Sequence, residues 1–289
     1  MKHKILLSLI MISILSINIL AIGQPVSTDF KNVKTTNFDD PAPIWNVGNS
    51  WTYTIDNFVV NYRYYDLKIY MIGRIDDLKW TVVDTSGSDY VVSLTGKITA
   101  DSYEINLPFG SRIIRITGSV KPLLTRLSGT IVFTKSDLEV KDVSANLKGI
   151  VPAKISPIPI SFPLPFKVTM DGDLSTVFPL FDFPLYGNKF WSLPSITITS
   201  NLKIGGLLGL IKYPISFRTS YSWTPFAFFC KPKVDVTVEA GTFSAYNITS
   251  TLFNIFEYYY APSVGNLVKI KAILTNGQVY GQLKSYNYP

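Results

Sequence analysis

Histidine and cysteine are almost missing from this 289-residue chain, which has one of each. The single histidine, His3, lies in an N-terminal stretch with the pattern of an export signal, so a processed chain would have none. Without histidine there is no Ser-His-Asp or Cys-His catalytic group, no imidazole zinc site and no histidine general base. The lone Cys230 excludes an internal disulfide and any multi-cysteine metal site, and its phenylalanine-rich surroundings indicate a buried side chain. We therefore expect no catalytic residue, no metal and no cofactor.

Long apolar runs are missing after the first two dozen residues, so no later segment is expected to span a membrane. At the N-terminus, a basic start precedes an apolar run over residues 5–21, which ends in small residues at the positions that a signal peptidase reads. This pattern predicts a signal peptide over residues 1–23, with cleavage before Gln24, and a secreted or cell-envelope protein. The run is shorter than the roughly 20 residues of a spanning helix. An uncleaved N-terminal anchor is the alternative.

Charge is sparse, because Asp, Glu, Lys and Arg together make up 16% of the chain. Loss of Lys2 and Lys4 with the signal peptide lowers the 27 basic residues to 25, which against 20 acidic residues leaves a net charge of +5. The densest basic cluster along the sequence is only Lys231-Pro232-Lys233. We interpret this excess as ordinary solubility charge and expect no nucleic-acid partner.

Alternation of apolar and polar residues dominates the chain, and helical spacing is hardly sustained anywhere. Residues 92–100 and 213–223 show it clearly, with apolar side chains at every second position. One face of each strand is then buried and the other is wet, as in antiparallel sheets. An Asn-Gly pair at 276–277 predicts a tight hairpin near the C-terminus. The fold class that follows is all-β, with roughly a dozen strands in large antiparallel sheets that are half-barrel or sandwich-like.

Proline recurs through residues 151–183, which predicts edge or extended connecting structure there, because proline cannot donate to a central ladder. This stretch divides the chain. The expected organisation is a flexible N-terminal segment over 24–42, a first β unit over 43–150, the proline-rich connection over 151–183 and a second β unit over 184–289. A weak sequence echo between the starts of the two units suggests that they are related.

Aromatic residues are abundant, with 5 Trp, 17 Tyr and 18 Phe. Such side chains can line an apolar cavity or stack on sugars, and they can equally form a broad sheet core with tyrosines at its rim. The candidate ligand-binding residues are Tyr62, Tyr64, Trp80, Tyr221, Trp223 and Tyr259. Glu257 stands among tyrosines, where its carboxylate could be desolvated. Asn247-Ile248-Thr249 is a candidate glycosylation site at Asn247.

Two C-terminal patches carry a resemblance to a known group. Ala240-Gly241-Thr242-Phe243 with Ala245-Tyr246 forms the first patch, and Tyr258-Tyr259-Tyr260 with Pro262 and Val264-Gly265 forms the second. Together with Gly48-Asn49-Ser50-Trp51-Thr52-Tyr53 upstream, they resemble the TapB-like family of uncharacterised exported β proteins. The resemblance implies an antiparallel half-barrel similar to periplasmic lipoprotein carriers, and it implies no catalytic residue.

Three functions are compatible with these features. The first is non-catalytic binding of a lipid or another apolar small molecule on a concave sheet face. The second is a structural or adhesive role at the cell envelope, with surface contacts and no ligand. The third is a carboxylate-dependent glycosidase, which would need two facing carboxyl groups about 5 to 10 Å apart.

Overall fold

The computed structural model describes residues 39–64, 67–109, 112–120, 125–155, 161–195, 197–205, 215–222, 226–251, 256–274 and 277–289. It confirms the all-β fold class, because the described residues form fifteen antiparallel strands and no helix. The strands are β1 (Ser50–Tyr64), β2 (Leu67–Asp84), β3 (Asp89–Phe109), β4 (Arg112–Val120), β5 (Thr125–Thr134), β6 (Val140–Ile155), β7 (Ser161–Phe178), β8 (Lys189–Leu193), β9 (Thr197–Gly205), β10 (Ile215–Ser222), β11 (Phe226–Val238), β12 (Gly241–Ser250), β13 (Phe256–Ala261), β14 (Asn266–Leu274) and β15 (Gly277–Asn287). None of the described segments is a helix of the length and apolarity needed to cross a membrane.

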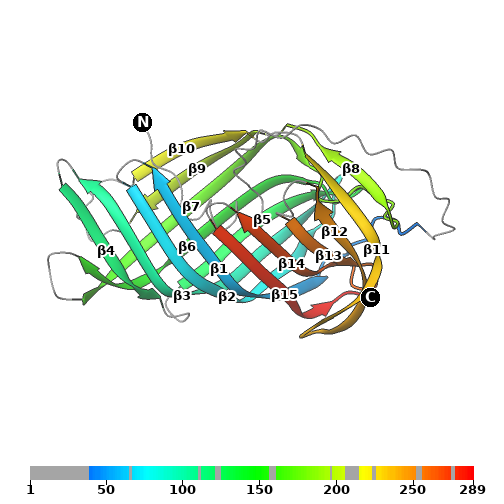
Figure 1. Ribbon diagram of the computed structural model, residues 1–289, viewed down its shortest axis with the longest axis horizontal. Helices are drawn as coiled ribbons and strands as arrows, with labels where there is room; N and C mark the ends of the chain where they lie inside the picture. The colour runs from blue at the N-terminus through cyan, green and yellow to red at the C-terminus, as the bar shows by residue number, and fades with distance from the viewer. Residues whose placement is uncertain are drawn as a thin grey trace.

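All fifteen strands belong to one curved sheet, shown in Figure 1. From β1 the chain runs outward as a meander through β2, β3, β4 or β5, β6 and β7, and then through β9 to the edge strand β10. The second half returns from the other edge, from β8 and β11 through β12, β13 and β14 to β15, which pairs with β1. The first and last strands therefore meet in the middle of the sheet, while β10 and β8 form its two open edges.

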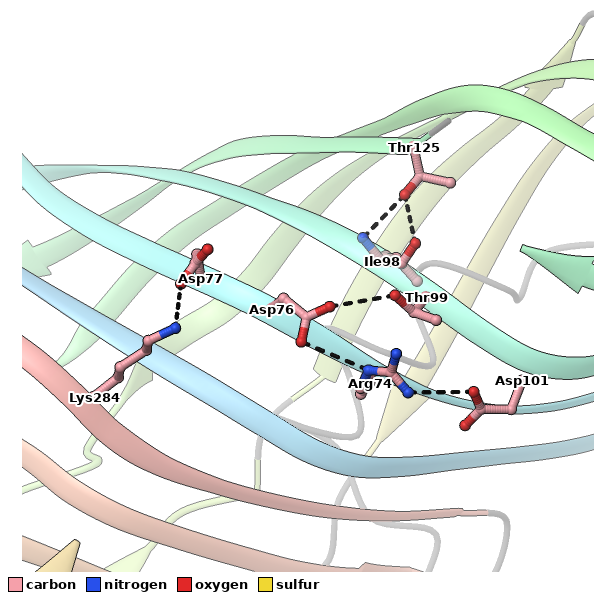
Figure 2. A network of polar contacts seen from close by, with 8 residues as sticks. All are labelled: Arg74, Asp76, Asp77, Ile98, Thr99, Asp101, Thr125 and Lys284. Atoms are coloured by element: carbon pink, nitrogen blue, oxygen red, sulfur yellow. Dashed lines mark hydrogen bonds and ion pairs between the residues drawn. The ribbon is translucent and has the colours of Figure 1, made fainter. Parts of the chain in front are cut away.

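Strands β4 and β5 share one position in the sheet, end to end between β3 and β6. β5 pairs with the first half of β3 and β4 pairs with the second half. Between the two partners, the Thr125 hydroxyl accepts a hydrogen bond from the Ile98 N–H (3.0 Å) and donates one to the Ile98 carbonyl (2.5 Å). Figure 2 shows this pair of bonds. A single side chain thus satisfies both backbone groups of Ile98 where β3 changes neighbour.

The two faces of the sheet differ in chemistry, as the alternation in the sequence predicts. We call the face that holds Trp51, Val92 and Leu94 the inner face, because these side chains are fully buried within one continuous apolar cluster. The opposite, outer face carries the polar residues of the same strands, among them Thr95 and Lys97, which are both exposed. Burial of one face drives the sheet to curve around a common core.

The proline-rich residues 151–183 contain the end of β6 and all of β7, and Pro152 pairs with Pro163 in the ladder between these strands. β9 pairs with β7 only from Lys167 onward, so the part of β7 that holds Pro163 and Pro165 has one described neighbour. Prolines are tolerated here because that side of the strand requires no ladder donor. The two β units expected from the sequence contribute strands to this one sheet and residues to the same buried cluster.

The predicted C-terminal hairpin is confirmed, because β14 pairs with β15. The last described pair of this ladder is Leu274 with Gly277, so the glycine of the Asn-Gly pair belongs to β15. The hairpin between β11 and β12 follows the same rule: Val238 pairs with Gly241, whose φ of 134° favours glycine.

Candidate functional site

One end of the inner face is filled by aromatic side chains and by two segments that are not strands. We call it the filled end; it includes the starts of β1 and β6, the end of β2, and strands β8 and β11–β13. Residues 39–49 bring Trp45 onto this face, where its ring lies 4.9 Å from that of Trp51, 5.1 Å from that of Tyr90 and 5.4 Å from that of Phe133. Such offset and edge-on arrangements are the favourable ones for aromatic rings.

Buried polar atoms at the filled end are paired with the turn between β13 and β14. The Trp45 indole N–H donates to the Gly265 carbonyl (2.9 Å), and the Trp51 indole N–H donates to the Val264 carbonyl (2.8 Å). The Tyr53 hydroxyl donates to the Leu267 carbonyl at 3.1 Å. These bonds satisfy donors that would be costly to bury alone. They also join the beginning of the described chain to residues 264–267, near its C-terminal end.

The segment 179–188 covers the adjoining part of the inner face. The rings of Phe181 and Phe183 lie 5.1 and 5.5 Å from that of Tyr260, and the Tyr258 hydroxyl donates to the Leu180 carbonyl (2.6 Å). Burial raises the pKa of Tyr258 well above its ordinary value. The hydroxyl is therefore held in its neutral, donating form.

A polar clamp joins the two covering segments. Asp40 pairs with Leu185 through two backbone hydrogen bonds, and its carboxylate accepts a bond from the Tyr246 hydroxyl at 2.6 Å. The Lys233 ammonium lies 2.6 Å from the same carboxylate and 4.9 Å from the Tyr246 ring centroid. Burial and the neighbouring Asp40 raise the pKa of Tyr246. Lys189, which is buried, forms an ion pair with Asp182 (3.2 Å) and so stabilises the second segment.

The other end of the inner face is built from apolar rows that the strand register aligns. We call it the apolar end; it comprises residues 58–64, 67–72, 101–109, 112–120, 148–155 and 161–166. One row consists of Tyr62, Ile69, Ile105, Ile116 and Ile155, and the next of Val60, Met71, Tyr103, Gly118, Ala153 and Phe162. The described non-strand segments that cover the inner face make their contacts at the filled end.

Gly118 has a specific role in the second row. A Cβ atom at this position would lie 2.2 Å from the Pro152 carbonyl oxygen and 2.7 Å from the Tyr103 hydroxyl. Because glycine leaves this space, the Tyr103 hydroxyl can donate to the Pro152 carbonyl at 2.9 Å. Burial raises the pKa of Tyr103 to about 12, so this bond also persists at neutral pH.

The six candidate ligand-binding residues do not form one group. Trp80 lies on the inner face at the filled end, opposite Trp51 and 5.5 Å from the Tyr53 ring, and its indole N–H is buried with no hydrogen-bond partner among the described residues. Tyr62 and Tyr221 occupy inner-face register positions, opposite Ile69 and Ile198. Tyr64 ends β1, opposite Leu67. Trp223 lies outside the described residues.

Tyr259 lies on the outer face, because its neighbours Tyr258 and Tyr260 are buried in the core. Its hydroxyl donates to the Glu257 carboxylate at 2.6 Å, and this contact together with burial raises the pKa of Tyr259 to about 12. The Asn247 amide donates to the same carboxylate at 3.4 Å and to the Tyr259 hydroxyl at 3.2 Å. The structure thus brings together a candidate ligand-binding residue, the candidate glycosylation site and the carboxylate among tyrosines.

Glycosylation of Asn247 stays a prediction, and the geometry constrains when it could occur. Asn247 lies within β12, its amide nitrogen is hydrogen bonded, and Thr249 of the same sequon is buried. An oligosaccharide would have to be attached before β12 joins the sheet. For Glu257, the contacts are with Tyr259, Asn247 and Lys271 (3.9 Å), so these partners include no second carboxylate of the kind that a glycosidase uses.

A second polar network, shown in Figure 2, follows the outer face of β2 and β3. Arg74 lies 3.6 Å from Asp76 and 3.4 Å from Asp101, while Lys284 of β15 lies 2.9 Å from Asp77. All of these side chains are at least one-third exposed, so the network links β2 with β3 and, across β1, with β15 at the surface. Among the described residues, no group of three or more His, Cys, Asp or Glu side chains is placed to hold a metal ion.

Cys230 is fully buried, as its sequence context predicts, and burial raises the pKa of its thiol to about 12. It therefore packs as a small apolar side chain. Sequence reasoning did not identify Trp45, Ile105 or Ile116 as inner-face residues, because their alignment depends on strand pairing.

Comparison of the chain with protein-family models, with curated proteins and with solved structures found no match.

Proposed function

We propose that this protein is exported and non-catalytic, and that it holds a lipid or another apolar molecule on the inner face of its sheet, at the apolar end. The observation that carries the proposal is the contrast between the two ends of that face. At the filled end, two chain segments cover the inner face. At the apolar end, the register aligns apolar residues across as many as six strands, without a described segment over them. Met71, Tyr103 and Ile116 of these rows are buried, whereas Ile105 is partly exposed.

The size of the apolar rows supports an extended apolar ligand. Neighbouring strands lie about 4.8 Å apart, so a row of five strands extends about 19 Å across the sheet. Burial of apolar surface of this width stabilises a complex in rough proportion to the area removed from water. Aliphatic side chains dominate one of the rows and offer few polar groups for a sugar or a nucleotide.

Two further features agree with the proposal. The N-terminal pattern favours export, which would place the protein where envelope lipids are handled. The resemblance to the TapB-like group implies a half-barrel similar to periplasmic lipoprotein carriers. Trp80 of the filled end, whose buried indole N–H has no partner among the described residues, is the tryptophan whose fluorescence we expect to respond to a bound ligand.

Native mass spectrometry of the protein purified gently from its own host tests the proposal. We expect a mass excess that matches one apolar molecule and that disappears after delipidation. The delipidated protein should then take up a fluorescent fatty acid. A bare mass together with no uptake would contradict the proposal and would favour a structural role at the envelope.

A pair of variants locates the ligand. Ile105→Glu places a charge in the row at the apolar end, so fatty-acid uptake should fall at least tenfold, because a charge is costly to bury beside an apolar ligand. Ser119→Glu adds the same charge at an exposed outer position and should leave uptake unchanged. Ile105→Ala, which keeps the surface apolar, should retain most of the uptake. Equal uptake by the two glutamate variants would place the ligand elsewhere.

A further inference from the structure

Three cations lie side by side on the outer face, although they are far apart in the sequence. Arg126 of β5 pairs directly with Lys148 of β6, and Lys148 pairs directly with Lys167 of β7. All three side chains are exposed. Directly opposed residues on neighbouring strands have Cβ atoms about 5 Å apart, so the three charges form one short ladder.

This ladder lacks the compensation found elsewhere on the outer face. Arg115 is paired with Glu104 at 2.7 Å, and Lys284 is paired with Asp77. Arg126, Lys148 and Lys167 form no ion pair with any residue that the structure describes. Like charges placed directly opposite each other destabilise a sheet. The stability of the fold therefore does not explain why these three cations lie together. Binding of an external anion would explain it.

The surroundings of the ladder combine further cations with exposed apolar side chains. Lys68 and Lys154 are exposed on the same outer face, as their register with Asn106 and Thr117 shows. Three exposed apolar residues lie on the same outer face: Ile150 (44%) between Lys148 and Lys154 along β6, Tyr70 (40%) next to Lys68 along that face and opposite Glu104, and Ile113 (55%) opposite Pro108. We call these eight residues the basic patch: Arg126, Lys148, Lys167, Lys68, Lys154, Tyr70, Ile113 and Ile150.

We propose that the basic patch docks on an anionic membrane surface. Its charge is complementary to phosphate-bearing lipid headgroups, and its exposed isoleucine and tyrosine side chains suit the boundary between headgroups and acyl chains. Lysine and arginine can extend their charged ends toward phosphates while their alkyl stems stay on apolar surface. The cations are exposed and spread from β2 to β7, a layout suited to an extended surface rather than to one enclosed ion. This contact does not depend on whether the inner face holds a ligand.

Co-sedimentation with lipid vesicles tests this proposal, with the protein in the form that its host produces. We expect binding to vesicles that contain 30% phosphatidylglycerol, weak binding to pure phosphatidylcholine vesicles, and a loss of binding as salt rises from 0.05 to 0.5 M, because salt screens exposed charges. The triple variant Arg126→Gln, Lys148→Gln and Lys167→Gln should bind anionic vesicles about 100-fold more weakly, at roughly fivefold for each cation removed.

A matched control removes three other exposed lysines, in the variant Lys79→Gln, Lys231→Gln and Lys269→Gln. It loses the same net charge and should bind as the unchanged protein does. All variants share the same N-terminal segment, so any difference in vesicle binding between them comes from the substituted residues. The ladder variant should also have an unchanged or higher Tm, because it relieves repulsion between neighbouring strands. This result separates lost docking from lost folding.

Ile150→Ser tests the apolar part of the basic patch. It should weaken binding to anionic vesicles about threefold and leave the salt dependence unchanged. Equal binding by the ladder variant and its matched control would overturn the proposal. Binding to a soluble polyanion such as polyphosphate, without binding to anionic vesicles, would overturn it as well and would indicate a soluble anionic partner.

Discussion

The two ends of the inner face use the same alternating strand pattern in different ways. At the filled end, Trp45 and Phe181 arrive from outside the sheet and cover its aromatic residues, and the buried donors there reach backbone carbonyls. At the apolar end, the rows around Ile105 and Ile116 come from the sheet alone. Met71, Tyr103 and Ile116 of these rows nevertheless belong to the buried cluster. The difference teaches that one sheet face can contribute to a core both beneath covering segments with polar anchors and without a described segment over it.

Alkali should have the largest effect on this contrast. Burial raises the pKa values of Tyr53 and Tyr258 well above their ordinary value and that of Tyr103 to about 12. A raised folded-state pKa means that the stabilisation is complete below pH about 10 and is lost as the pH rises through the folded-state value. We expect Tyr103 to ionise near pH 12, and the filled end to unfold cooperatively at higher pH. Ultraviolet titration of tyrosinate beside circular dichroism measures both. Ionisation of all buried tyrosines in one step near pH 10 would contradict the expected difference between Tyr103 and the tyrosines of the filled end.

Trp51→Ala should lower the free energy of unfolding by about 4 kcal/mol, because it empties a fully buried site and removes the bond to the Val264 carbonyl. Ile105→Ala at the apolar end should cost only about 1 kcal/mol, since that side chain is partly buried. Urea unfolding followed by circular dichroism gives both values. Similar losses would mean that the apolar end is as tightly packed as the filled end.

Thr125→Val should lower the free energy of unfolding by about 2 to 3 kcal/mol, because it leaves the N–H and carbonyl of Ile98 without their partner between β4 and β5. Thr125→Ser keeps the hydroxyl and should cost less than about 1 kcal/mol. Amide hydrogen exchange at Ile98 should rise in the valine variant alone. If serine and valine are equally destabilising, the methyl group rather than the hydroxyl is what matters at this site.

Tyr246→Phe should cost about 1.5 kcal/mol by removing the hydroxyl that bonds to Asp40 and Leu185. The effect should be local, so hydrogen exchange should rise at the Asp40 and Leu185 amides and stay unchanged around Tyr103. The matched control is Tyr259→Phe on the outer face, which should cost less than about 1 kcal/mol. Faster exchange across the whole sheet would show that the clamp supports more than the covering segments.

Asp101→Asn should have the smallest effect, below about 0.5 kcal/mol, because its pairing with Arg74 is exposed to water and screened by salt. Thermal unfolding at low and at high salt measures it. A loss above 1 kcal/mol at low salt would indicate that the network of Figure 2 is cooperative rather than a set of separate surface pairs.

Much of the fold could be predicted from local pattern. The alternation over residues 92–100 gave β3, and the Asn-Gly pair gave the last hairpin, although Gly277 proved to be paired in the strand. The prolines predicted edge or connecting structure, whereas Pro163 and Pro165 lie within the long strand β7. One-sided pairing accommodates them there, and the sequence alone does not reveal which strands have a neighbour on both sides.

The candidate site was harder to predict, because it depends on which residues the register makes neighbours. Trp80 and Tyr259 were both candidates because of their aromatic side chains, yet they lie on opposite faces of the sheet. Arg126, Lys148 and Lys167 are separated by about twenty residues each and show no basic cluster along the chain. Their adjacency arises only from strand pairing, which single-sequence patterns do not specify.

The pairing of β1 with β15 has a consequence for the order of events during synthesis. β1 is the first described strand to leave the ribosome and β15 the last, so the middle of the sheet closes only after every other described strand has been made. Contacts so distant in sequence form slowly. If the protein is exported as we propose, the chain would stay incompletely folded while it passes through an export channel, which is the state that such a channel accepts.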